Sequence, residues 1–166
     1  MPKQINFTGN IDLLLEDYRE LLVSRFDKDY RRRDLSRIDT IIVHHSGSDR
    51  STLESMSVYH TADKPNGHGW PRLSYHYVIH GGVIFQINDI DKLTYHCKGY
   101  NARSIGICVI GNYEDKLPPQ DDLTALTGLI KTLNFSVPGV KVLGHRDVRN
   151  TICPGKKLHD YLKTNF

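Results

Sequence analysis

Residues 38–46 read Ile-Asp-Thr-Ile-Ile-Val-His-His-Ser, a largely apolar and β-branched run that ends in two histidines and a serine. A short apolar run of this composition is typical of a buried β-strand. Polar side chains at the end of a strand are held by a rigid scaffold, which suits them to chemistry. The stretch therefore predicts a buried strand over residues 38–45 with functional groups at its C-terminal end.

The residues after this strand alternate between helix and strand patterns. Ser51 and Glu54 have the spacing of a capping box, which predicts a helix from Ser51 to Ala62. Gly81-Gly82 separates two β-like runs and predicts a hairpin. The other expected elements are strands over residues 75–80, 83–88, 104–110 and 140–143, and helices after Pro118-Pro119 and over residues 156–163. This order predicts an α/β fold, a single domain with a central mixed β-sheet flanked by helices.

The first 37 residues have a different character. Over residues 10–25, Leu14, Tyr18 and Leu21 follow helical spacing, and Asn10 is a candidate N-cap. Residues 27–39 are almost all charged or polar, as in a solvated connection. We expect a helical N-terminal extension over residues 1–37 and the main domain over residues 38–166.

Length and composition exclude several classes of protein. The chain has 166 residues, 39% hydrophobic and 25% charged, which suits a folded domain rather than a disordered chain. Its longest apolar runs are far shorter than the roughly 20 residues of a membrane span. The N-terminal residues lack the apolar core of a signal peptide, so we expect synthesis in the cytoplasm. The net charge of +3 does not demand a nucleic acid partner.

Two segments carry side chains that bind metal ions. His44 ends the first predicted strand, His145 lies in Gly144-His145-Arg146-Asp147, and Cys153 lies in Thr151-Ile152-Cys153-Pro154-Gly155. Imidazole and thiolate are preferred zinc ligands, and three protein ligands with one open position make a catalytic site. On spacing alone, however, histidines with ordinary packing roles explain the pattern equally well.

The order of several motifs resembles the peptidoglycan amidase family. The matching stretches lie between residues 41 and 155 and occur in the family's order: Ile41–Ser46, Tyr59-His60, Gly69-Trp70, Ser74–Ile79, Gly99–Tyr113 and Leu143–Gly155. That family includes zinc-dependent N-acetylmuramoyl-L-alanine amidases, phage lysozyme-type amidases and peptidoglycan recognition proteins. The resemblance implies the peptidoglycan recognition protein-like fold.

The resemblance also implies roles for individual residues. His44, His145 and Cys153 occupy the positions of the zinc ligands, and Tyr75 and Thr151 those of catalytic residues. Tyr75 would position water or donate a hydrogen bond to the developing oxyanion, and Thr151 would add a hydroxyl donor. Recognition proteins that bind without cleaving typically carry serine in place of this cysteine, so Cys153 favours an enzyme.

Substrate contacts are expected beside the metal. His96 resembles a cleft histidine of the family, Asn101 and Arg103 could hold polar groups of the peptide, and Trp70 could form an apolar wall. Core packing is an equally good interpretation of Trp70. For His76, and for Cys97 and Cys108, we expect buried packing roles rather than ligation.

These residues predict a monomeric Zn²⁺ enzyme that hydrolyses the amide bond between N-acetylmuramic acid and L-alanine of peptidoglycan. The absence of a signal peptide suits a phage or prophage endolysin that acts on the cell wall. The alternative is a non-catalytic recognition module that grips peptidoglycan. A zinc protein that binds nucleic acid through Arg31–Arg33 is a more distant alternative, because the chain lacks CxxC pairs and a basic recognition helix.

Overall fold

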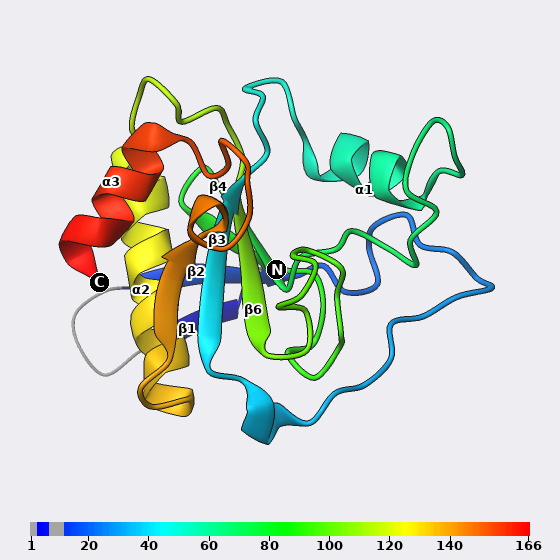
Figure 1. The fold of residues 1–166 in the computed structure, drawn as a ribbon, viewed down its shortest axis with the longest axis horizontal. Coiled ribbons are helices and arrows are strands. Elements are labelled where there is room, and N and C mark those ends of the chain that lie inside the picture. Colours follow the sequence, from blue (N-terminus) through cyan, green and yellow to red (C-terminus); the bar gives the residue numbers. More distant parts are fainter. Residues whose placement is uncertain (1–2, 7–11) are drawn as a thin grey trace.

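Seven strands of the described chain form one mixed sheet, in the order β1-β2-β5-β4-β6-β3-β7 (Figure 1). The computed structural model describes residues 3–6 and 12–166. The strands are β1 (Lys3–Asn6), β2 (Asp12–Asp17), β3 (Thr40–His45), β4 (Tyr77–His80), β5 (Val83–Gln86), β6 (Ser104–Val109) and β7 (Lys141–Gly144). The α-helices are α1 (Leu53–Thr61), α2 (Gln120–Ser136) and α3 (Lys156–Asn165), and short 3₁₀ turns cover Leu35–Arg37 and His145–Asp147. The predicted α/β fold with a mixed sheet is confirmed.

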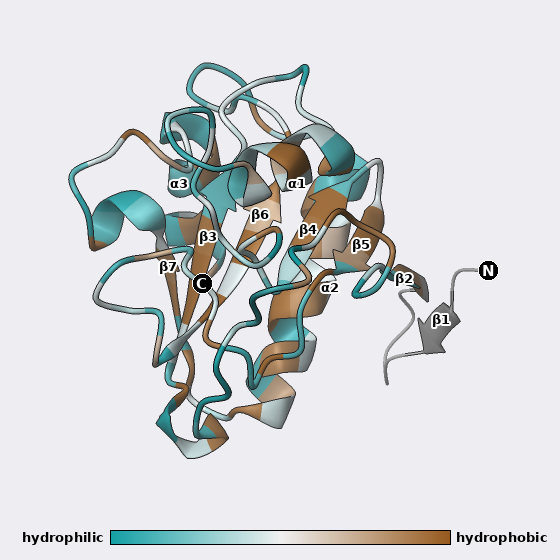
Figure 2. Cartoon of the chain, turned by 90° about the vertical axis from the view of Figure 1, so that its right-hand side faces the viewer, coloured by the Kyte–Doolittle hydropathy of each residue, from teal (hydrophilic) through white to brown (hydrophobic). Residues whose placement is uncertain are grey.

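The parallel centre of the sheet explains why its strands read as continuous apolar runs. β3 pairs in parallel with both β6 and β7, and β4 pairs in parallel with β6. All residues of β3 and β6 are buried, as expected for strands covered on both faces. Figure 2 shows the same concentration of hydrophobic residues in the central strands. Because these strands run in one direction, their C-terminal ends meet at one edge of the sheet.

The two faces of the sheet carry separate cores. Ile41 and Val43 of β3 face the cluster formed with α2 and α3, which includes Leu123, Leu126, Ile130 and Leu133 of α2. A second cluster on the opposite face contains Leu53 of α1, Val78 and Cys108. Side chains of a strand alternate between faces, so His44 points to the side of α1. In the described residues, no helix is long and apolar enough to span a bilayer.

The predicted helix over residues 10–25 is wrong in the part that the structure describes. Residues 12–17 form β2, which pairs in parallel with β5 and places Leu14 opposite Val83. Leu13 packs against α2 at Gly128, where an added Cβ would come within 2.6 Å of the Leu13 side chain. The pattern misled because a short apolar run fits either a strand or a helix, and here sheet pairing decides. Asn10, the expected N-cap, lies outside the described residues.

The later elements match their predictions within a few residues. The hairpin at Gly81-Gly82 joins β4 and β5, and both glycines adopt positive φ. The capping residue of α1 lies one position later than predicted. Thr52 and Ser55 form the capping box, in place of Ser51 and Glu54.

Candidate functional site

Three side chains that are far apart in sequence converge at the C-terminal edge of the sheet. His44 lies at the end of β3, and His145 follows β7, whose last residue Gly144 pairs with Val43. Cys153 lies in the loop before α3. One ligand atom from each of the three residues lies within 4.8 Å of the others. The His44 Nδ1 atom is 3.7 Å from the Cys153 Sγ atom, and the rings of His44 and His145 have centroids 4.5 Å apart.

This group has the chemistry of a zinc site. Two imidazoles and a thiolate are a donor set that Zn²⁺ favours, and three protein ligands leave a position for water or substrate. Burial lowers the pKa of both His44 and His145, which keeps the imidazoles neutral and able to donate a lone pair. Burial raises the pKa of the Cys153 thiol to about 12, so a metal that bound the thiolate would displace a proton.

A chain of hydrogen bonds fixes the orientation of the His44 ring. The Ser104 hydroxyl donates to the Tyr100 carbonyl, so its oxygen accepts from His96 Nε2 at 3.1 Å. His96 Nδ1 then carries no proton and accepts from His44 Nε2 at 3.0 Å. The remaining nitrogen, His44 Nδ1, therefore presents its lone pair toward Cys153. Partners of this kind set the tautomer and direction of a metal-binding histidine.

His96 has this position because β6 leaves room for it. It is nearly fully buried, and it lies over Gly106, where an added Cβ would come within 2.5 Å of the ring. Burial lowers the pKa of His96 to about 3, which keeps its ring neutral, as the hydrogen-bond chain requires. The sequence suggested His96 as a cleft residue, and it does line the cleft, but Ser104 and Gly106 gave no signal in the sequence.

Two hydrogen bonds from backbone amides hold Cys153 in its loop. The His45 amide donates to Cys153 Sγ at 3.4 Å, and the Cys153 amide donates to Thr151 Oγ1 at 3.2 Å. The Thr151 oxygen is thus occupied as an acceptor, while its hydroxyl hydrogen remains available to a substrate oxygen. Thr151 is partly exposed, so a substrate can reach it.

Tyr75 lies next to the same group. Its ring centroid is 5.2 Å from that of His44, and its side chain lines the adjoining cleft. Burial raises the pKa of Tyr75, so the phenol stays protonated and acts as a hydrogen-bond donor at neutral pH. The next residue, His76, faces the other way and is fully buried, with its Nδ1 accepting from the Gly106 amide. The predicted packing role of His76 is confirmed.

A cleft of about 400 Å³ extends from Tyr75 and His96, which both lie against His44, toward α1. Trp70 is partly exposed in its wall and stacks on His68, with centroids 4.0 Å apart and planes 9° from parallel. The structure thus places Trp70 at the cleft, where the sequence allowed a wall or a core residue. The lining consists of hydroxyl, aromatic and imidazole side chains and one methionine: Ser46, Ser51, Ser55, Met56, Tyr59, His60, His68, Trp70, Tyr75, Tyr95 and His96. Tyr59, Met56 and Tyr95 were not identified from the sequence as cleft residues.

Arg103 and Asn101 are not brought to this cleft. Arg103 Nε donates to Asp39 at 2.8 Å, and both residues precede the starts of their parallel strands, at the opposite edge from His44. Asn101 Oδ1 accepts from the Cys97 amide at 2.7 Å and closes a tight loop. These structural partners account for both side chains, so we assign neither of them to the substrate.

Comparison with known proteins gives the same family as the motifs. Residues 34–156 match the family model described as N-acetylmuramoyl-L-alanine amidase. Peptidoglycan-recognition protein LB of Drosophila melanogaster is 32% identical over 131 residues, which cover 71% of this chain and 55% of that protein. The endolysin of Klebsiella phage KP32 is 31% identical over 103 residues, which cover 58% of this chain and 68% of the endolysin.

The fold is shared with solved structures. A Drosophila PGRP-LB mutant in complex with tracheal cytotoxin has 28% sequence identity and a TM-score of 0.78, over 90% of this chain and 93% of that one. With the family model covering most of the chain and the fold in agreement, the chain belongs to the N-acetylmuramoyl-L-alanine amidase family.

Proposed function

We propose that this protein is a zinc-dependent amidase that hydrolyses the bond between N-acetylmuramic acid and L-alanine in peptidoglycan. The observation that carries the proposal is the convergence of His44, His145 and Cys153 within 4.8 Å, beside a cleft. Family membership supports amide hydrolysis as the reaction. Cys153 completes a set of three candidate zinc ligands that would leave one coordination position open, and this favours an enzyme over a recognition module.

Zinc held by these three residues would supply a Lewis acid that makes water nucleophilic near neutral pH and polarises an amide carbonyl. The Tyr75 phenol and the Thr151 hydroxyl would be hydrogen-bond donors to the oxygen of that carbonyl. Both would bond the carbonyl oxygen more strongly as it gains negative charge, and one such donor typically contributes about 3 kcal/mol to lowering the barrier. His96 and Ser104 would keep His44 in the tautomer that binds the metal.

The cleft would hold the substrate next to these groups. Trp70 and His68 present a flat stacked surface on which a sugar or an apolar part of the peptide can lie. Ser46, Ser51 and Ser55 add hydroxyl groups for polar atoms of the substrate. The peptidoglycan fragment named in the structure of the PGRP-LB complex supports a muropeptide as the ligand class.

Release of soluble material from dye-labelled cell walls tests the proposal. The zinc-loaded protein should release dye, a chelator should stop the release, and added Zn²⁺ should restore it. Mass spectrometry of the products should show peptides with a new N-terminal L-alanine. The Cys153→Ser variant should lose zinc and activity while remaining folded. Binding to cell walls with no release in the presence of zinc would instead support the recognition module.

For the biological role we propose a lytic enzyme of a phage or prophage. The support is the similarity to phage endolysins, of which the chain covers about two thirds. Addition of the purified protein to bacteria with permeabilised outer envelopes should lower the turbidity of the culture. Equal turbidity with the wild type and with Cys153→Ser would contradict the lytic role.

A further inference from the structure

Residues 18–33, here the 18–33 segment, lie against the loop that carries Trp70. Three hydrogen bonds join backbone carbonyls of that loop to the segment. Lys28 Nζ donates to the Gly69 carbonyl at 3.1 Å, the Arg25 amide to the Pro71 carbonyl at 2.8 Å, and the Tyr30 hydroxyl to the Arg72 carbonyl at 2.7 Å. The carbonyls on both sides of Trp70 are therefore held by donors from one segment.

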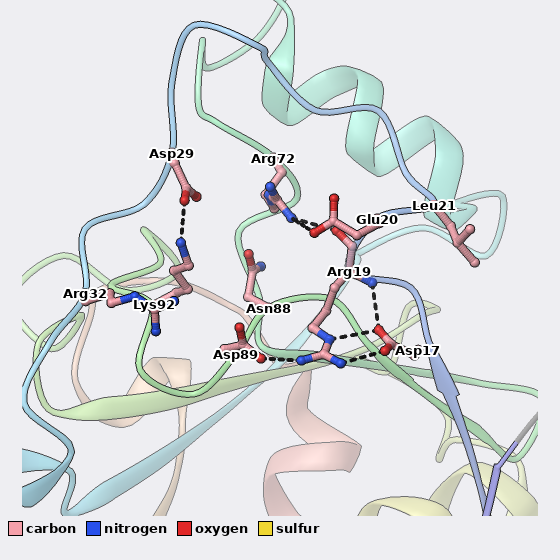
Figure 3. Close-up of a pocket in the computed structure, with 10 residues that line it drawn as sticks. All are labelled: Asp17, Arg19, Glu20, Leu21, Asp29, Arg32, Arg72, Asn88, Asp89 and Lys92. Carbon is pink, nitrogen blue, oxygen red and sulfur yellow. Dashed lines mark hydrogen bonds and ion pairs between the residues drawn. The ribbon is translucent and has the colours of Figure 1, made fainter.

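Charged side chains fasten the same segment to the body of the protein (Figure 3). Lys92 pairs with Asp29, and Arg19 Nη1 lies 2.5 Å from Asp89 Oδ1. Arg72 donates to the Arg19 carbonyl at 2.6 Å, so the loop and the segment are linked from both directions. The residues that make these contacts line a polar cavity of about 510 Å³.

Tyr30 joins the segment to the aromatic wall itself. Its side chain is 2% exposed, and its ring packs edge-on against Tyr95 with centroids 5.0 Å apart. The ring centroid of Tyr95 in turn lies 6.0 Å from that of Trp70, and both residues line the cleft. The hydroxyl and the ring of Tyr30 thus support the wall at two places.

A segment that only anchored the N-terminus could bond to any part of the surface. Here three donors of the segment bond to carbonyls within residues 69–72, while the Trp70 amide is held from the other side by the His60 carbonyl at 2.9 Å. We propose that the 18–33 segment positions the Trp70 wall and thereby sets the affinity of the cleft for muropeptide, without contact with the metal ligands. The proposal rests on the proposed function for the identity of the ligand.

The test uses Tyr30→Phe, which keeps the ring and removes the bond to the Arg72 carbonyl. Lys28→Met removes the hydrogen bond to the Gly69 carbonyl. Lys28 is exposed, so the fold tolerates this substitution. Arg31→Met is the matched control, because Arg31 is an exposed cation of the same segment whose side chain bonds to none of the described residues. Trp70 is the only tryptophan of the chain, so quenching of its fluorescence by acrylamide reports on the wall without any catalysis.

We expect acrylamide quenching to increase in Tyr30→Phe and, less strongly, in Lys28→Met, with no change in Arg31→Met. The KM for a soluble disaccharide-peptide, or its Kd if turnover is absent, should rise about 3- to 10-fold in Tyr30→Phe, since one hydrogen bond is lost. The kcat should stay within about twofold, because the metal group is untouched.

Unchanged quenching in both folded variants would overturn the positioning role, whether or not the protein is an amidase. Increased quenching with unchanged KM or Kd would overturn the effect on affinity. If Tyr30→Phe does not fold, Lys28→Met decides by the same two measurements. Absence of amide hydrolysis in the wild type would contradict only the proposed reaction, because quenching and Kd still report on the wall.

Discussion

At the scale of single residues, the site depends on a serine that touches neither metal nor substrate. Ser104 accepts from His96, and His96 fixes the tautomer of His44. Ser104→Ala leaves the buried Nε2–H of His96 without an acceptor, so the His96 ring can change to the tautomer with the proton on Nδ1. We expect zinc affinity to fall about 10-fold, in the range known for lost outer partners of metal ligands. Competition with a chromogenic chelator measures this affinity.

The control for that experiment is Ser136→Ala at the end of α2. Ser136 is exposed, and its hydroxyl donates within its own helix to Thr132. Equal zinc affinity in Ser104→Ala and Ser136→Ala would show that the hydrogen-bond chain does not orient His44.

Tyr75 allows a test of the donor role. Because burial raises the pKa of Tyr75, its hydroxyl is a donor and not a base at neutral pH. Tyr75→Phe should lower kcat about 100-fold, the typical cost of one oxyanion donor, with zinc content unchanged. Steady-state rates on a soluble muropeptide and metal analysis of the same sample measure both quantities. A kcat equal to the wild type would remove Tyr75 from the reaction.

At the scale of elements, alternation along β2 gives a prediction that separates a strand from a helix. Leu13 is 3% exposed and packs on α2, whereas its neighbour Leu14 is 40% exposed. Leu13→Ala should lower the free energy of unfolding by about 2–5 kcal/mol, and Leu14→Ala by less than about 1 kcal/mol. Urea denaturation of the two variants makes the comparison. Similar losses in both would contradict the burial pattern of β2.

The same element shows what the sequence could and could not predict. The run of residues 38–45 predicted β3 because a strand covered on both faces needs apolar residues throughout. Residues 12–17 form a strand that pairs with both β1 and β5, and local spacing does not contain that information. The division between an extension over residues 1–37 and an amidase domain over residues 38–166 stays a prediction. Deletion of residues 1–37, followed by measurement of melting and turnover, tests it.

The ligand group was predictable for a different reason. His44, His145 and Cys153 were identified by resemblance, and the parallel pairing of β3 with β7 explains why two of them meet. The cleft wall was less accessible to prediction. The loop that carries Trp70 is bonded by Arg25, Lys28 and Tyr30, whereas the charged composition of residues 27–39 suggested only a solvated connection.

At the scale of the whole molecule, buried neutral histidines make stability depend on pH. Burial lowers the pKa of His60 to about 4 and that of His96 to about 3, from 6.5 for a free side chain. Above pH 6.5 both the folded and the unfolded states are neutral at these positions. Below it the unfolded state binds protons that the folded state refuses, so stability falls as pH decreases from 6.5 toward 4. The lowered pKa values of carboxylates such as Asp147 act only below about pH 4, outside this window.

Each histidine that is protonated only in the unfolded state contributes about 1.4 kcal/mol per pH unit to the slope of the free energy of unfolding against pH. We expect the free energy of unfolding of the metal-free protein, from urea denaturation with chelator present, to fall steeply between pH 6.5 and 5. His60→Asn should reduce the slope by that amount, because the Asn side chain does not titrate. His80→Asn, at an exposed position, is the control for the replacement of a histidine by asparagine. A free energy that stays level from pH 7.5 to 5 would show that these imidazoles take up protons in the folded protein, and the neutral hydrogen-bond chain through His96 could not then persist in acid.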